Sequence, residues 1–99
     1  MNFEPKIAKI LKQIIAVCIK VGHVDEIILY GSRAKGTHME KSDLDIALKG
    51  VNLDIEQLRD EVELIDTLLA IDLIDINNCK NERLLQEVEK DGITLYRKV

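Results

Sequence analysis

The stretch ILYGSRAKGTHMEKSDLDIAL, residues 28–48, decides how this chain folds and where its chemistry lies. An apolar run ends at Gly31 and Ser32, and ten residues follow before Asp43 and Asp45, which begin a second apolar run. Because side chains alternate along a strand, the two aspartates should share one face, with Cβ atoms about 6–7 Å apart. Two like charges in that position need a physical reason.

A cation supplies that reason. Two ionised carboxylates on one strand face repel each other and raise each other's pKa unless a cation lies between them. Mg²⁺ prefers hard oxygen ligands and takes few of them from the protein, which leaves room for water and substrate phosphates. The pair Asp43 and Asp45 therefore predicts one or two Mg²⁺ ions, bound together with a nucleotide.

The glycine turn predicts the other half of such a site. After a strand, Gly31 allows the main chain to approach a phosphate closely. If Ser32 opens a short helix, its free N–H groups and dipole favour an anion, and its hydroxyl can donate one more hydrogen bond. Arg33 and Lys35 add positive charge close by. We therefore expect these four residues to bind a nucleotide through its phosphates.

A Walker A phosphate-binding loop is excluded. The segment GSRAKGTH, residues 31–38, contains G-x-x-x-x-G after a strand, as a Walker A loop does. That loop requires Lys and then Ser or Thr after its second glycine. Here Thr37 and His38 follow Gly36, so the turn is interpreted as a different kind of phosphate-binding loop.

The whole chain predicts an α/β (α+β) fold, with a small mixed sheet of three to four strands flanked by helices, in a single domain over residues 1–99. Residues 31–42 are too long for a tight hairpin and contain helix formers, so a short helix is expected there. The other expected elements are a helix from Glu4-Pro5 to Gly22, strands at 27–30, 43–50 and 70–77, a helix capped by Asp54 with helical spacing from Ile55 to Leu69, a helix at 81–91, and a short extended segment from 93.

Composition restricts the class of protein. The net charge is −4, and residues 51–99 carry 12 acidic against 6 basic residues, which argues against an extensive nucleic-acid surface. Aromatic residues make up only 3%, so no stacking platform for single strands is expected. No apolar run approaches the ~20 residues of a membrane span, and the N-terminus lacks a signal-peptide pattern. We therefore expect a cytoplasmic protein.

The motif resembles that of a known superfamily. Gly31 and Ser32, then ten residues, then D-x-D at Asp43 and Asp45 resemble the signature of the polymerase-β-like nucleotidyltransferases. The segments LYGSRAKG and SDLDIAL, together with the short chain, are similar to the minimal nucleotidyltransferases, the MNT or MntA-type group. The resemblance implies that the glycine and serine hold the triphosphate, that the two aspartates bind two Mg²⁺, and that Arg33 supports the loop or the phosphates.

The resemblance also implies a third carboxylate on a later strand, which binds metal and helps to activate the attacking hydroxyl. The candidates are Asp72 and Asp75, in AIDLIDIN. They are three residues apart, so on a regular strand they face opposite ways and only one should join the site. Asp72 is the first choice, since the family's third carboxylate follows a hydrophobic residue early in this strand, and Asp75 is the fallback.

The implied reaction is in-line displacement at the α-phosphate of ATP, with release of pyrophosphate. Because 99 residues leave no room for an acceptor domain, the acceptor must come from a partner or a second subunit. In the minimal group the usual partner is a small helical HEPN protein, often a toxin, which the resemblance implies is neutralised by transfer of AMP to a tyrosine.

Two alternatives stay open from the sequence. One is a catalytically silent antitoxin that covers its partner's surface. The other is a nucleotidyltransferase acting on a small molecule or nucleic acid. The sequence identifies neither the base nor the oligomeric state, and its supply of Ile and Leu is compatible with a homo-oligomer or a hetero-complex.

Overall fold

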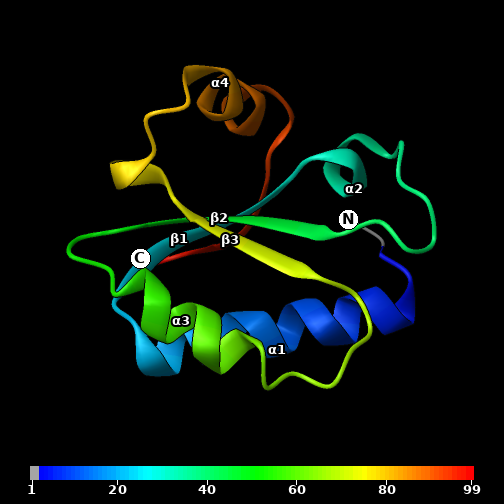
Figure 1. The fold of residues 1–99 in the computed structure, drawn as a ribbon, viewed down its shortest axis with the longest axis horizontal. Coiled ribbons are helices and arrows are strands. Elements are labelled where there is room, and N and C mark those ends of the chain that lie inside the picture. The colour runs from blue at the N-terminus through cyan, green and yellow to red at the C-terminus, as the bar shows by residue number, and fades with distance from the viewer. Residues whose placement is uncertain (1–2) are drawn as a thin grey trace.

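The computed structural model describes residues 3–99, in which four strands form one mixed sheet with helices on both faces (Figure 1). The strands lie in the order β3-β2-β1-β4; β2 pairs parallel with β3, and β1 pairs antiparallel with β2 and β4. This confirms the predicted fold class. The elements are α1 (Pro5–Val21), β1 (Val24–Tyr30), α2 (Ser32–Lys35), β2 (Leu44–Gly50), α3 (Ile55–Val62), β3 (Ile71–Asp75), the 3-10 turn η1 (Ile76–Asn78), α4 (Glu82–Asp91) and β4 (Ile93–Arg97).

Helix α1 is amphipathic and supplies much of the core. Pro5 lies in the first turn, where its missing N–H costs no helical hydrogen bond. Gly22 ends the helix with an N–H bond of 3.1 Å to the Cys18 carbonyl. Burial raises the pKa of the Cys18 thiol to about 11, so the thiol stays protonated at neutral pH. The buried side chains of α1 recur at spacings of three and four: Ile7, Ile10, Leu11, Ile14 and Cys18.

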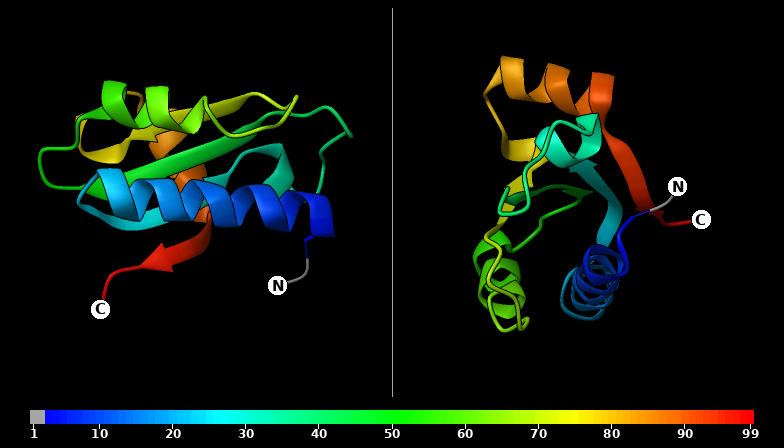
Figure 2. Two further views of the ribbon diagram at one scale, coloured as in Figure 1. Left: turned by 90° about the horizontal axis from the view of Figure 1, so that it is seen from below. Right: turned by 90° about the vertical axis from the view of Figure 1, so that its right-hand side faces the viewer.

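The two faces of the sheet carry hydrophobic cores of different size. Helices α1 and α3 lie side by side over one face, as Figure 1 and Figure 2 show, and the larger core lies there, around strand residues such as Leu29 and Ile46. Helix α4 covers the opposite face, over a smaller cluster of Ile28, Tyr30, Ala47 and Val88. Along each strand, the residues that alternate with those in the larger core therefore point toward the α4 side.

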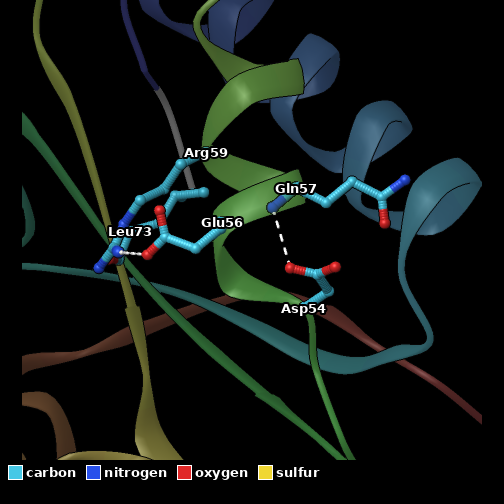
Figure 3. Close-up of polar contacts among 5 residues, drawn as sticks. All are labelled: Asp54, Glu56, Gln57, Arg59 and Leu73. Atoms are coloured by element: carbon cyan, nitrogen blue, oxygen red, sulfur yellow. Dashed lines mark hydrogen bonds and ion pairs between the residues drawn. The ribbon is translucent and has the colours of Figure 1, made fainter.

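Helix α3 is capped at its start and tied to β3 by an arginine (Figure 3). Asp54 Oδ1 accepts a hydrogen bond from the Gln57 N–H at 3.1 Å, which confirms the predicted cap. Arg59 Nη2 donates to the Leu73 carbonyl, also at 3.1 Å. Because β3 is an edge strand, this bond satisfies a main-chain carbonyl of that edge and holds the strand beside the position of Asp72.

The helix predicted from the spacing between Ile55 and Leu69 is too long, because α3 ends at Val62. The Ile65 N–H then donates to the Val62 carbonyl, a turn-type bond of 3.0 Å. Thr67 Oγ1 accepts from the Leu69 N–H at 3.1 Å, a local bond that competes with helical ones. Ile65 and Leu69 still pack against the larger core, so their spacing arises from burial of these side chains and does not indicate a helix.

The other predicted elements are present, with shifts at their ends. Strand β2 starts at Leu44, so Asp43 lies outside it, and β3 ends at Asp75, because residues 76–78 form the turn η1. Strand β1 starts at Val24, three residues earlier than expected, while the extended segment near the C-terminus forms β4. The short helix between the first two strands is α2, and Gly92 follows α4 as predicted. No helix within residues 3–99 is long and apolar enough to cross a membrane.

Candidate active site

The chain leaves β1 through a turn in which two main-chain N–H groups have no main-chain partner. Gly31 has a φ of 78°, a conformation that favours glycine. Its carbonyl accepts from the N–H groups of Ala34 and Lys35, both at 3.1 Å, so α2 starts at once. Within the described part of the chain, the N–H groups of Ser32 and Arg33 have no main-chain partner. They are free to receive oxygen atoms of a ligand.

The same glycine lies directly against Asp45. Gly31 is buried, and a Cβ added to it would collide with the Asp45 carboxylate. Gly36 has the same φ of 78°, but a Cβ there would meet open space. The absence of a side chain at Gly31 is therefore what allows the turn and this carboxylate to touch.

Three polar side chains line up across neighbouring strands. Tyr30 is the partner of Asp45 in the antiparallel register of β1 and β2, and Asp45 is the partner of Asp72 in the parallel register of β2 and β3. Directly paired residues point to the same face of a sheet, so all three point toward the α4 side. Asp43 lies one residue before β2, close enough for its charge to act on Asp45.

Asp75, the fallback for the third carboxylate, lies at the far end of β3. It is three residues beyond Asp72, so its side chain points to the opposite face of the sheet. Its Oδ1 accepts from the Asn77 N–H at 3.1 Å and its Oδ2 accepts from Asn78 Nδ2 at 2.7 Å. Asp75 thus caps η1, and Asp72 is the candidate that the register brings beside Asp45.

Negative charge is concentrated along this row. Burial raises the pKa of the Asp45 carboxyl, and the charges of Asp72, Asp43 and Glu87 raise it further. Burial also raises the pKa of Tyr30, and Asp45, Asp72 and Glu87 add to that effect. The repulsion expected between the aspartates is present, and Glu87 of α4 adds to it. No sequence pattern singled out Glu87, because its position depends on how α4 packs on the sheet.

Arg33 supports the loop that leads to Asp43. Its guanidinium is buried and donates from Nε to the Ser42 carbonyl at 3.0 Å and from Nη2 to the Glu40 carbonyl at 2.9 Å. These bonds fix the segment just before β2, and thereby the start of the strand that carries Asp45. Of the two roles that the sequence suggested, these contacts favour loop support, and a phosphate contact stays a prediction.

Lys35 reaches across to α4. Its Nζ lies 3.1 Å from Oε1 of Glu87, and both side chains are partly exposed, at 40% and 34%. The cation predicted to meet phosphate is therefore paired with a carboxylate in this structure.

The carboxylates fit Mg²⁺ by their chemistry. Asp43, Asp45 and Asp72 offer the hard oxygen donors that this ion prefers, and the raised pKa of Asp45 indicates negative charge that a cation would compensate. Among residues 3–99, however, no three His, Cys, Asp or Glu side chains are already arranged to hold a metal ion. The fit rests on the donor set, and side chains would have to adjust to form a ligand sphere.

The fold and this row of carboxylates define a class of protein. The family model "Polymerase beta, Nucleotidyltransferase" matches residues 12–99, which is most of the chain. The chain therefore belongs to this nucleotidyltransferase family, and the resemblance seen in the motif is confirmed. A search of curated proteins found none that matches the chain.

Solved structures give a finer comparison. A chain of the crystal structure of a toxin–antitoxin with AMP-PNP is 27% identical, with a TM-score of 0.74, over 89% of this chain and 73% of that one. The toxin–antitoxin MntA–HepT gives 22% identity and a TM-score of 0.68, over 92% and 73%. The complex of a tri-AMPylated Shewanella oneidensis HEPN toxin with an MNT antitoxin gives 22% and 0.68, over 92% and 72%. At 22% identity, the last two show the fold alone.

Proposed function

We propose that this chain is a Mg²⁺-dependent nucleotidyltransferase that transfers AMP from ATP to a tyrosine hydroxyl of a HEPN-type toxin, and so acts as its antitoxin in the cytoplasm. The observation that carries the proposal is the pairing of Asp45 with Asp72 beside the Gly31 turn, in a member of the nucleotidyltransferase family. We further propose that residues 1–99 form one minimal nucleotidyltransferase domain.

Two of the similar structures support the choice of nucleotide and acceptor. The relative that is 27% identical was solved with AMP-PNP, a nucleoside triphosphate analogue, which supports a triphosphate substrate. The Shewanella oneidensis complex contains a HEPN toxin that carries AMP groups, which supports a protein acceptor of that kind.

Each part of the site has a role in binding the triphosphate. The free N–H groups of Ser32 and Arg33 and the Ser32 hydroxyl hydrogen-bond to phosphate oxygens. Asp43, Asp45 and Asp72 would hold Mg²⁺, which when bound neutralises phosphate charge and stabilises the attacking and leaving oxygens. The pairing of Asp45 and Asp72 on adjacent strands holds two of these carboxylates near the Gly31 turn, which supports binding of the triphosphate there.

The step itself is an in-line displacement. The phenolic oxygen of the acceptor tyrosine forms a bond to the α-phosphorus, while the bond from that phosphorus to the bridging oxygen breaks and pyrophosphate leaves with the electron pair. The carboxylate of Asp72 accepts the phenolic proton. Orientation of the two reactants and compensation of charge contribute most of the acceleration.

The test combines transfer with toxin neutralisation. The chain is incubated with Mg²⁺, ATP labelled at the α-phosphate and the protein encoded beside it, which the proposal takes to be the HEPN toxin, in parallel with an Asp43→Ala/Asp45→Ala variant. We expect label on a tyrosine of the HEPN protein, and its loss in the variant together with loss of neutralisation. Neutralisation by the variant without any label would contradict the proposal and favour an antitoxin that acts by binding alone.

A further inference from the structure

The ion pair between Lys35 and Glu87 joins the phosphate-binding turn to α4. Lys35 is the last residue of α2, four positions after Gly31, and Glu87 lies one residue before Val88, which packs on the sheet next to Tyr30. The pair is short, at 3.1 Å, but partly exposed. Ion pairs of this kind are weak in water and are readily exchanged for another partner.

Glu87 also lies close to the candidate active site. Its charge contributes to the raised pKa of both Asp45 and Tyr30, so the carboxylate belongs to the same region of negative potential. A triphosphate that enters this region is repelled by Glu87 and attracted by Lys35. Glu87 therefore opposes nucleotide binding in two ways, by its own charge and by pairing with the Lys35 ammonium.

The surroundings of Lys35 give its side chain room to change partner. It lines a hollow of about 260 Å³ on the α4 side, together with Arg83, Gln86, Glu87, Lys90 and Asp91. It also lines a second hollow of about 420 Å³, which extends toward α1 and includes Ile7, Arg33 and Ile93. An ammonium group on a flexible stem between two hollows can leave the carboxylate without repacking the core.

We propose that Glu87 is a positioning residue that holds Lys35 in the nucleotide-free protein and releases it to the triphosphate when nucleotide binds. This inference rests on the proposed use of the site for a nucleoside triphosphate. Glu87 weakens nucleotide binding, and it takes Lys35 back as pyrophosphate leaves. The pair thereby adjusts affinity for substrate and favours release of product.

A double-mutant cycle tests the proposal. The Kd for ATP with Mg²⁺ is measured by calorimetry in the absence of acceptor. Glu87→Gln should lower the Kd by about three- to fivefold, the range open to an exposed ion pair. In a Lys35→Gln background, the same change should alter the Kd by less than about twofold, because the cation it releases is gone.

Glu89→Gln is the matched control. Glu89 lies on the same helix and is exposed, and its replacement changes the net charge by the same amount. We expect it to leave the Kd unchanged, and thermal unfolding of each variant checks that the fold is intact. If Glu87→Gln raised the affinity for ATP equally in the wild-type and Lys35→Gln backgrounds, the proposal would be contradicted. That result would indicate simple repulsion between Glu87 and the triphosphate. A loss of affinity in Glu87→Gln would overturn it outright.

Failure of this inference can be distinguished from failure of the proposed function. A wild-type chain that binds ATP but shows no coupling between Lys35 and Glu87 contradicts this inference alone. A chain with the expected coupling but no transfer to the HEPN protein contradicts only the proposed acceptor. A chain that binds no ATP contradicts both.

Discussion

Asp45 and Asp72 are direct partners in the parallel register of β2 and β3, so two carboxylates lie side by side on one face of the sheet. Like charges placed directly opposite each other on neighbouring strands destabilise a sheet. Asp43 and Glu87 add to the same repulsion. In this arrangement the stability of the sheet and the proposed binding of Mg²⁺ place opposite requirements on the two carboxylates.

Removing the charge of Asp45 should therefore stabilise the metal-free protein. Asp45→Asn keeps the shape of the side chain and removes a charge that Asp72, Asp43 and Glu87 all repel. We expect the free energy of unfolding at pH 7 to rise by about 0.5–2 kcal/mol, as for other stabilising substitutions at functional sites. Urea unfolding in the presence of EDTA measures it.

The sign of the pH dependence provides the control. The pKa of Asp45 is raised in the folded protein, so protonation of Asp45 favours the folded state. This contribution to the free energy of unfolding is complete below the ordinary pKa of 3.8 and is lost as the pH rises through the raised pKa. The advantage of Asp45→Asn should accordingly shrink as the pH is lowered toward 3.8. An advantage that is the same at both pH values would show that repulsion is not its cause.

Gly31→Ala should be far more harmful than Gly36→Ala. Both glycines have a φ of 78°, which alone costs an alanine about 1 kcal/mol, but at Gly31 the new Cβ also collides with the Asp45 carboxylate. We expect Gly36→Ala to lose about that amount of stability and keep nucleotide binding, and Gly31→Ala to lose binding as well. Calorimetry and urea unfolding test both; equal effects would contradict the close approach of Gly31 and Asp45.

Arg33→Lys should loosen the loop before β2. A lysine retains the charge but lacks the guanidinium that donates to the carbonyls of Ser42 and Glu40. Loss of hydrogen bonds from a buried charged group should lower the free energy of unfolding by about 1–3 kcal/mol and speed hydrogen exchange in residues 39–43. Arg83→Lys, at an exposed position of α4, is the matched control and should change neither. If exchange in the loop is unaffected, loop support by Arg33 is wrong.

Features that depend on neighbours in the sequence were predictable. Pro5, Gly22 and Asp54 act within one turn of their own helices, and the helix formers that follow Gly31 predicted α2. The end of α3 was missed because Ile65 and Leu69 reach the core without being helical.

Features that depend on tertiary packing were out of reach. Local sequence does not specify the register of β3 against β2, so the preference for Asp72 over Asp75 rested on the family resemblance. Glu87 lies more than forty positions from Asp45 in the chain and meets the site only because α4 packs on that face.

The most direct test of the central claim, that the pair Asp45 and Asp72 forms the catalytic centre, compares two single substitutions. Initial rates of label transfer from α-labelled ATP to the HEPN protein are measured, with Mg²⁺, for Asp72→Asn and Asp75→Asn. We expect Asp72→Asn to lower the rate by about 10²-fold or more, the scale of a lost acid–base group. Asp75→Asn keeps a side-chain oxygen that can accept from the Asn77 N–H, so both the stability and the rate of transfer should stay nearly unchanged. Loss of transfer in Asp75→Asn, with Asp72→Asn still active, would show that Asp72 is not the third carboxylate of the site.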